Sequence, residues 1–256
     1  MDTMLAPMDN GTFDSRVTYG AGHALKRAAE EAKLKLFAAL AVELGVPPAH
    51  LDCAGGQIIN VFDRDAAGID FWQAIRKYQN SIGTLWGFGE YTPPQPKGNY
   101  PGNLIGPSPA FGFAAQVAEV EVDVDTGRVR VVKFWDAGDC GQLINPMSVK
   151  GQVEGAISMG LGLALTEEII VSADGRHLNP NLADYKIPTA VDMPEMDIEC
   201  VDSYDPSAPF GNKEIGEGPT TPVAPAVLNA VYDAIGVRLT HAPISPESVL
   251  RGLGKL

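Results

Sequence analysis

The spacing of apolar and polar residues along the chain predicts helices in some segments and strands in others. Over residues 21–46, AGHALKRAAEEAKLKLFAALAVELGV, apolar residues recur at the three- and four-residue spacing of a helix. Gly45 follows the last periodic positions, and Pro47 and Pro48 come next. Proline cannot continue a helix, because it lacks the backbone N–H that the hydrogen-bond ladder needs. We therefore expect a long helix over 21–46.

A different pattern occupies residues 114–139, AAQVAEVEVDVDTGRVRVVKFWDAGD. Apolar and polar residues alternate, the triplet DTG interrupts them, and the alternation then resumes. This pattern predicts a β-hairpin with one buried face, because successive side chains of a strand point to opposite sides. A further strand followed by a turn is expected within 169–180, IIVSADGRHLNP, and another strand within 195–204, EMDIECVDSY.

Two more helices are expected in the second half of the chain. Small residues recur at helical spacing over 145–169, which predicts a helix that packs closely against a neighbour. An amphipathic helix is expected over 222–236. Helices mixed with antiparallel strands place the chain in the α+β class. We expect one region over 1–256, either undivided or with two subdomains that meet near 110–145.

The segment 82–112 is rich in glycine, proline and aromatic residues and shows no periodicity. Loops of this length are usually functional segments or linkers, and the aromatic residues favour an ordered loop. Two readings stay open for the aromatic side chains: a funnel for an aromatic substrate, or ordinary loop packing. These side chains are Trp86, Phe88, Tyr91 and Phe111.

Composition excludes several classes of protein. A chain of 256 residues that is 45% hydrophobic can bury a core. Its net charge of −13, without a basic cluster, argues against nucleic acid as a partner. No apolar run approaches the roughly 20 residues of a membrane helix, so no membrane span is expected. The acidic N-terminal segment lacks the apolar stretch of a secretory signal, which favours a cytoplasmic location.

The residues that commonly ligate metals are scattered along the chain. No CxxC or HExxH spacing occurs, so the chain offers no zinc site, iron–sulfur cage or other metal site made by the protein alone. The cysteines are expected to be reduced and mostly buried. They are Cys53, Cys140 and Cys200, and the histidines are His23, His50, His177 and His241.

Polar residues flanked by glycine precede or open three of the expected helices. Gln152 lies in KGQVEGA, Asp14 and Ser15 lie in GTFDSRV, and Glu217 lies in IGEGPT. A helix N-terminus with exposed N–H groups can bind an anion, and glycine lets a ligand approach the backbone. Each residue taken alone is more often a helix cap. The occurrence of three such sites in one chain favours a ligand that they share, but only modestly.

Several longer motifs together carry a family resemblance. The chain carries four of these motifs, in the order DNGTFDSRVTYGAGHALKRAAE, GQVEGAISMGLGLALTEEI, NLADYKIPT and NKEIGEGPTTPVAPAVLNAVYDAIG. In that order they resemble the C-terminal half of the molybdenum-binding subunit of the xanthine dehydrogenase and aldehyde oxidoreductase family. The loop and the run 106–146 look most like 4-hydroxybenzoyl-CoA reductase-type bacterial relatives. The resemblance covers nearly the whole chain, so 1–256 would be the family's second molybdenum-cofactor-binding region.

The resemblance implies a role for each matching position. Glu217 matches the active-site base beside the metal-bound hydroxyl, and Gly216 matches the glycine that shapes the turn. Gln152 matches the glutamine that hydrogen-bonds the pyranopterin. A loop whose backbone comes close to the metal and the cofactor is matched by Thr12, Phe13, Asp14 and Ser15.

The same resemblance implies cofactors and partners. The cofactor is a molybdenum pyranopterin, expected in its cytosine dinucleotide form, whose sulfur atoms hold the metal. The family's earlier glycine-rich segments are absent from this chain. We therefore expect a hetero-oligomer with a larger molybdenum-binding subunit, a [2Fe-2S] subunit and an FAD subunit. The expected substrate is an aromatic or N-heterocyclic compound.

Two other functions stay open. The chain could be a non-catalytic assembly or binding module, or a truncated fragment that keeps the fold; the carboxylate of Asp14, where the relatives carry a small uncharged residue, favours that reading. It could also be a small-molecule binder unrelated to molybdenum, for which only the glycine-rich loops and helix N-termini argue. Glu214 is expected to be an exposed charge of the turn.

Overall fold

The computed structural model of the chain describes Met4 and residues 11–13, 15–63, 65–93 and 110–256. The chain forms two compact units. Unit 1 contains Met1–Arg16 and Pro96–Leu256, and unit 2 contains Val17–Gln95. The segment 110–145, where an approximate boundary was expected, lies within unit 1.

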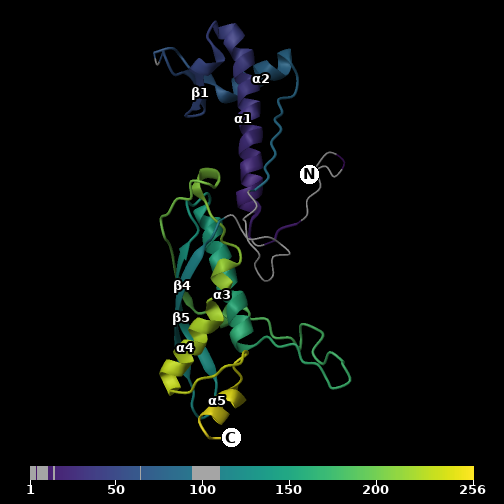
Figure 1. The fold of residues 1–256 in the computed structure, drawn as a ribbon, viewed down its shortest axis with the longest axis vertical. Helices are drawn as coiled ribbons and strands as arrows, with labels where there is room; N and C mark the ends of the chain where they lie inside the picture. The colour runs from purple at the N-terminus through teal and green to yellow at the C-terminus, as the bar shows by residue number, and fades with distance from the viewer. Residues whose placement is uncertain (1–3, 5–10, 14, 64, 94–109) are drawn as a thin grey trace. The chain divides into compact units, whose positions relative to one another are not determined.

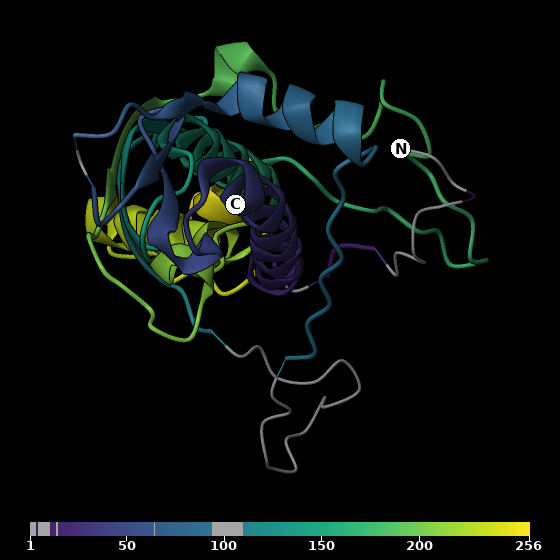
Figure 2. The same cartoon turned by 90° about the horizontal axis from the view of Figure 1, so that it is seen from above.

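Unit 2 is organised by one long helix. Its elements are α1 (Val17–Leu44), η1 (Pro48–His50), β1 (Leu51–Ala54), β2 (Gln57–Asn60), β3 (Ile69–Asp70) and α2 (Phe71–Ser81). The helix expected over 21–46 is thus confirmed and begins four residues earlier, at Val17. The second helix, α2, lies across α1 (Figure 2). The core between the helices and the three-stranded antiparallel sheet contains Leu36, Phe37, Leu40, Ala41, Leu51, Ile58, Ala74 and Tyr78.

The chain leaves α2 and returns in an extended conformation along α1 (Figure 1). A Cβ atom on Gly87 would lie 1.9 Å from the carbonyl oxygen of Ala28, so glycine permits the backbones to touch. The ammonium of Lys35 lies 3.6 Å from the ring centroid of Trp86. Three of the four aromatic residues considered for a substrate funnel, Trp86, Phe88 and Tyr91, belong to this returning segment. Trp86 and Phe88 are 62% and 65% exposed, and the two readings of the aromatic side chains both stay predictions.

Unit 1 contains a three-stranded sheet in the order β4–β5–β6. Its strands are β4 (Phe113–Val122), β5 (Val129–Asp139) and β6 (Glu195–Cys200). The expected hairpin is confirmed, since β4 and β5 pair antiparallel across the turn 123–128. The expected strand in 195–204 is also present, but β6 pairs with β5 in parallel. The segment 169–180 forms a single bridge, Val171–His177, in place of the expected strand.

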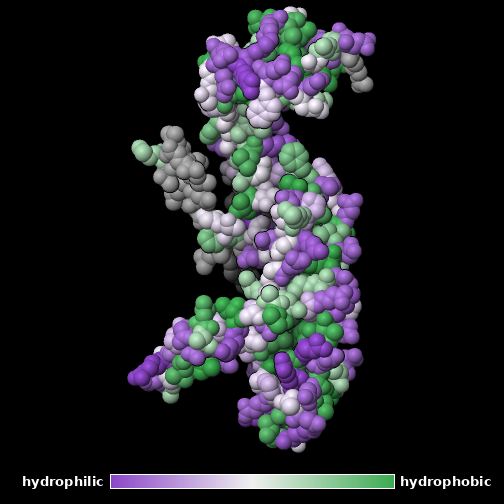
Figure 3. Space-filling view, turned by 180° about the vertical axis from the view of Figure 1, so that it is seen from behind, coloured by the Kyte–Doolittle hydropathy of each residue, from purple (hydrophilic) through white to green (hydrophobic). Residues whose placement is uncertain are grey.

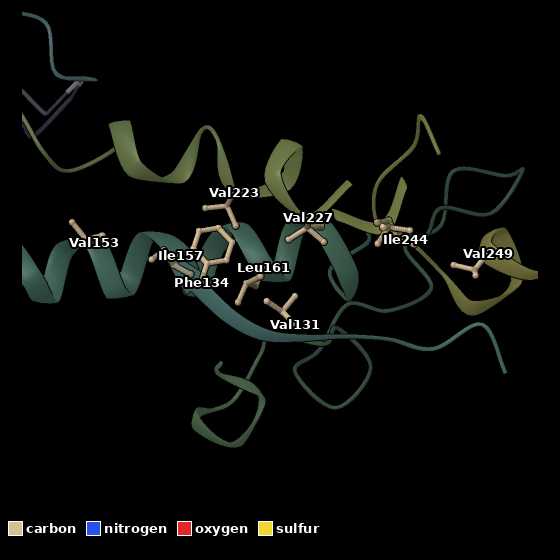
Figure 4. Packing of buried hydrophobic residues seen from close by; sticks show 11 residues of the cluster. Val131, Phe134, Val153, Ile157, Leu161, Val223, Val227, Ile244 and Val249 are labelled. Carbon is tan, nitrogen blue, oxygen red and sulfur yellow. The ribbon is translucent and has the colours of Figure 1, made fainter. Parts of the chain in front are cut away.

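Two helices, α3 (Pro146–Leu165) and α4 (Val223–Ile235), pack on this sheet, and α5 (Pro246–Gly252) follows. Figure 4 shows side chains of α3, α4 and β5 meeting in one core. The helices approach closely, because a Cβ atom on Gly160 would lie 2.4 Å from Cβ of Val223. This confirms the close packing expected for the small-residue helix. The buried members of the core are Val131, Phe134, Val153, Ile157, Leu161, Ala164, Val223, Val227, Val231, Ile244 and Val249.

A segment that we call the arm, residues 166–189, extends away from the sheet and helices of unit 1 (Figure 1). Asn179 holds its base, since its side chain accepts from Ile170 N and donates to the carbonyl of Glu168 at 2.9 and 2.6 Å. The rest of the arm presents apolar side chains to solvent (Figure 3). Its exposed apolar residues are Ile169, Ile170, Val171, Leu178, Leu182 and Ile187.

The remaining 3-10 helices are short. They are η2 (Ala190–Asp192), η3 (Pro209–Gly211) and η4 (Gly218–Thr220). None of the helices in the described part of the chain is long and apolar enough to cross a membrane.

Candidate active site

Glu217 lies in the turn that leads into η4 and then into α4. It occupies the N-cap position of η4, yet its carboxylate makes no capping hydrogen bond to the described backbone. The N-cap position of α4 is taken by Pro222. The carboxylate is exposed. Helix capping, one of the two explanations that the sequence offered for this residue, is therefore not what the side chain does.

Ser15, from the N-terminal loop, holds Glu217 at two points. Its hydroxyl accepts the backbone N–H of Glu217 at 2.9 Å and donates to Oε2 of the same residue at 3.3 Å. A serine hydroxyl can do both, because it has one donor and two acceptor positions. Ser15 has a φ of 54°, which is unusual for a residue other than glycine. The loop thus accepts a strained backbone where it meets the turn.

Gly216 and Gln152 complete the cluster. A Cβ atom on Gly216 would lie 2.8 Å from Oγ of Ser15 and 4.0 Å from Oε1 of Gln152. Gln152 lies on α3 and has an exposed side chain. Capping of α3 falls instead to Asn145, which accepts from Ser148 N at 3.1 Å. Three segments that are distant in sequence therefore bring a hydroxyl, an amide, a carboxylate and a bare glycine backbone together.

A buried polar pair lies behind this turn. Gln116 on β4 donates through Nε2 to Oδ1 of Asp136 on β5 and to the carbonyl of Pro219, each at 2.7 Å. Asp136 is 3% exposed. Burial raises the pKa of the Asp136 carboxyl, and the hydrogen bond from Gln116 opposes that rise. This pair was not predicted from the sequence, where its signal is a glutamine among the inward-facing residues of β4.

An ion pair lies at the start of the same turn. Nζ of Lys213 is 2.7 Å from Oδ2 of Asp139, and the two side chains are only 15% and 19% exposed. Burial acts to raise the pKa of Asp139. The hydrogen bonds from Lys213, Ser203 and the Gly141 N–H outweigh that effect and lower it. The pair fixes the strand end of β5 to the turn.

The cluster offers donors for a cofactor but no metal cage. Within the described residues, no three side chains of histidine, cysteine, aspartate or glutamate come together as metal ligands. The three cysteines are free; Cys140 is buried and Cys53 is exposed. A metal at this place would need ligands that a cofactor supplies. The hydroxyl, the amide and the backbone at Gly216 suit an organic cofactor of that kind, because they donate and accept hydrogen bonds without ligating a metal.

Comparison with known proteins identifies the family. Residues 1–194 match the model described as "Molybdopterin cofactor-binding domain". The chain belongs to this family. A molybdopterin cofactor agrees with the donor set above, because its metal is not held by protein side chains alone.

Relatives and solved structures agree with the molybdopterin-binding family. The chain is 34% identical over 255 residues to the putative xanthine dehydrogenase molybdenum-binding subunit XdhA of Escherichia coli (strain K12), covering 96% of this chain and 32% of the relative. It is 30% identical over 268 residues to the 6-hydroxypseudooxynicotine dehydrogenase complex subunit gamma of Paenarthrobacter nicotinovorans, covering 99% and 32%.

Among solved structures, the CO dehydrogenase of Oligotropha carboxidovorans superposes with a TM-score of 0.84 at 26% identity, over 99% of this chain and 31% of that one. The quinoline 2-oxidoreductase of Pseudomonas putida 86 gives a TM-score of 0.80 at 25% identity, over 96% and 31%. These likenesses support the expected α+β class. The chain spans about a third of the length of these molybdopterin-family proteins.

The other residues singled out from the sequence differ in how the structure places them. Thr12 and Phe13 are exposed in the loop that carries Ser15. Asp14 lies outside the described residues. Glu214 is half-buried rather than the exposed charge that was expected, because the turn folds against β5 and Gly112. Phe111 is 63% exposed in unit 1.

Proposed function

We propose that this chain is part of the catalytic component of a molybdenum hydroxylase-type oxidoreductase, in which Glu217 is the active-site base. One observation carries the proposal. The carboxylate of Glu217 is free of any capping role and is held by Ser15 beside Gly216 and Gln152. A general base needs this kind of fixed position within reach of the group that loses a proton.

The residues divide the work of the site. In this proposal the Gln152 amide would hydrogen-bond the pyranopterin, and the loop sequence of Thr12, Phe13, Asp14 and Ser15 would help to hold the cofactor next to Gly216. When bound, the molybdenum cofactor supplies the two-electron chemistry at the substrate carbon. Glu217 accepts the proton that the oxygen nucleophile loses. Because Ser15 donates to Oε2, the other carboxylate oxygen, Oε1, would be the one to take the proton.

The proposal includes an aromatic or N-heterocyclic substrate. Two relatives carry names of that chemistry, quinoline 2-oxidoreductase and 6-hydroxypseudooxynicotine dehydrogenase. The likeness to 4-hydroxybenzoyl-CoA reductase-type relatives that the sequence indicated points to the same class of substrate. The cytosine dinucleotide form of the cofactor and a cytoplasmic location complete the proposal.

The proposal also includes partner chains. A larger molybdenum-binding subunit would supply the rest of the cofactor site, and a [2Fe-2S] subunit and an FAD subunit would carry electrons away. The relatives are named as subunits, and this chain spans about a third of their length. The arm supports a partner, because its ordered base and exposed apolar side chains suit a surface that another chain covers.

The test uses the complex as it exists in its own cells. The tagged chain is purified under mild conditions, and the co-purifying proteins and the molybdenum content are determined. We expect a larger partner and near-stoichiometric molybdenum, and a lone chain without metal would favour a non-catalytic module. Glu217→Gln should then lower turnover by about 10²–10⁴ with the molybdenum content unchanged. Unchanged turnover would remove Glu217 from the mechanism. Glu199→Gln, an exposed glutamate of β6, is the control.

A further inference from the structure

The buried pair Gln116–Asp136 contacts the turn that carries Glu217. The two residues are opposite one another in the β4–β5 register, so the sheet fixes their spacing. The single NH2 group of Gln116 donates to both Asp136 and the Pro219 carbonyl, which uses both of its hydrogen atoms and fixes the orientation of the amide. Pro219 follows Glu217 by two residues and is fully buried.

Two atoms of the pair are left unpaired. Oε1 of Gln116 and Oδ2 of Asp136 are buried without a hydrogen-bond partner in the part of the chain that the structure describes. Burial without a partner is costly for a polar atom and far more costly for a charged one. A protonated Asp136 avoids the charge. Besides its internal hydrogen bond, this buried pair makes one hydrogen bond to the turn, from Gln116 to the Pro219 carbonyl.

Glu217 is consequently held from both sides. Ser15 binds its backbone N–H, and Gln116 binds the carbonyl two residues further along. We propose that Gln116 and Asp136 are positioning residues that act on Glu217 through the Pro219 carbonyl. This inference rests on the proposed function, since it assumes that Glu217 is the base. A displacement of a catalytic group by about 1 Å can lower a rate by a factor of about 10².

The test is a double-mutant cycle in the purified complex. Gln116→Leu keeps the approximate shape of the side chain and removes both donors. It should lower kcat by about 10–100-fold, with KM and molybdenum content little changed. In a Glu217→Gln background the same substitution should cause no further loss, because its effect passes through the carboxylate. Two losses that multiply in the double variant would overturn the inference.

A conservative variant and a substitute keep the test decisive. Asp136→Asn still accepts from Gln116 and can donate to its Oε1, so kcat should stay near that of the unchanged enzyme. If Asp136→Asn lowered kcat as much as Gln116→Leu does, the role of Asp136 as an uncharged positioning residue would be refuted. Gln116→Glu, which keeps the chain length and removes the NH2 group, replaces Gln116→Leu if that variant does not assemble.

The outcomes separate the two proposals. If Glu217→Gln leaves turnover unchanged, Glu217 is not the base, and the proposed role of Glu217 and the positioning inference fail together. If Glu217→Gln abolishes turnover while Gln116→Leu retains full kcat, the positioning inference alone fails.

Discussion

The hydroxyl of Ser15 bonds both the backbone N–H and the carboxylate of Glu217, a residue 202 positions away in the chain. The N-terminal loop and the turn before α4 therefore form one site. The strained φ of Ser15 fits this role, since strain of that kind persists only where surrounding contacts hold it.

Two substitutions of Ser15 distinguish the effect of its hydroxyl on turnover from the effect of its strained backbone. Ser15→Ala removes both hydrogen bonds and should lower turnover by about tenfold, because Glu217 loses its orientation. Ser15→Gly removes the same hydroxyl but accepts the positive φ without cost. Steady-state kinetics on both variants should show similar losses. Normal turnover in Ser15→Gly alone would show that only the strain matters.

The two glycines beside Glu217 provide a matched pair. A Cβ atom on Gly216 would lie 2.8 Å from Oγ of Ser15, whereas no described atom lies within 4 Å of a Cβ on Gly218. Gly216→Ala should displace the Ser15 hydroxyl and lower kcat by about tenfold or more. Gly218→Ala should leave kcat nearly unchanged. Equal effects of the two substitutions would contradict the arrangement of the cluster.

Two glycines of α3 test the packing of the core. Gly160→Ala drives a methyl group into Val223 and should lower the free energy of unfolding by about 1–3 kcal/mol. No described atom lies within 4 Å of a Cβ on Gly155, so Gly155→Ala should raise it by about 0.5–1 kcal/mol through helix propensity. Urea unfolding of the purified chain measures both. A stabilising Gly160→Ala would refute the close contact of α3 and α4.

The Lys213–Asp139 pair gives a prediction for pH. The pKa of Asp139 lies below its ordinary value of 3.8 in the folded chain. Its contribution to stability is therefore present above that value and is lost as the pH falls through the folded pKa. Lys213→Met should lower the free energy of unfolding at neutral pH by about 1–3 kcal/mol, because the poorly solvated carboxylate loses its cation and keeps only the hydrogen bonds from Ser203 and the Gly141 N–H.

The deficit of Lys213→Met should shrink in unfolding experiments as the pH falls below the ordinary aspartate pKa of 3.8 and Asp139 becomes protonated. A deficit independent of pH would mean that lost packing, not the ion pair, causes the effect. Lys255→Met is the control. Its partner Asp125 is 87% exposed, and exposed pairs contribute at most about 1 kcal/mol.

The local spacing of apolar and polar residues was sufficient to predict the elements that this spacing defines. The alternation over 114–139 predicted the β4–β5 hairpin, and the helical spacing predicted α1, α3 and α4. The parallel pairing of β6 with β5 could not be predicted, because it depends on residues about 60 positions apart. Within 169–180 the expected turn is present, since Gly175 N donates to the carbonyl of Ser172, but the expected strand is reduced to the Val171–His177 bridge.

The site was reached mainly through the family resemblance. That resemblance named Glu217, Gln152, Gly216 and Ser15 separately, and only the structure places them together. Gln116 and Asp136 escaped notice, because a polar residue in a strand is normally taken to face solvent. Their inward direction follows from the register of the whole sheet, which one strand's pattern does not contain.

The long separation between Ser15 and Glu217 also orders events during synthesis of the chain. At about 5–20 residues per second, the N-terminal loop leaves the ribosome roughly 10–40 s before its partner turn exists. Unit 2 and the β4–β5 hairpin, which rest on contacts closer in sequence, can fold during that interval. The nascent loop therefore exists for some time without its partner, and the proposed active site is completed only once the turn before α4 has been made.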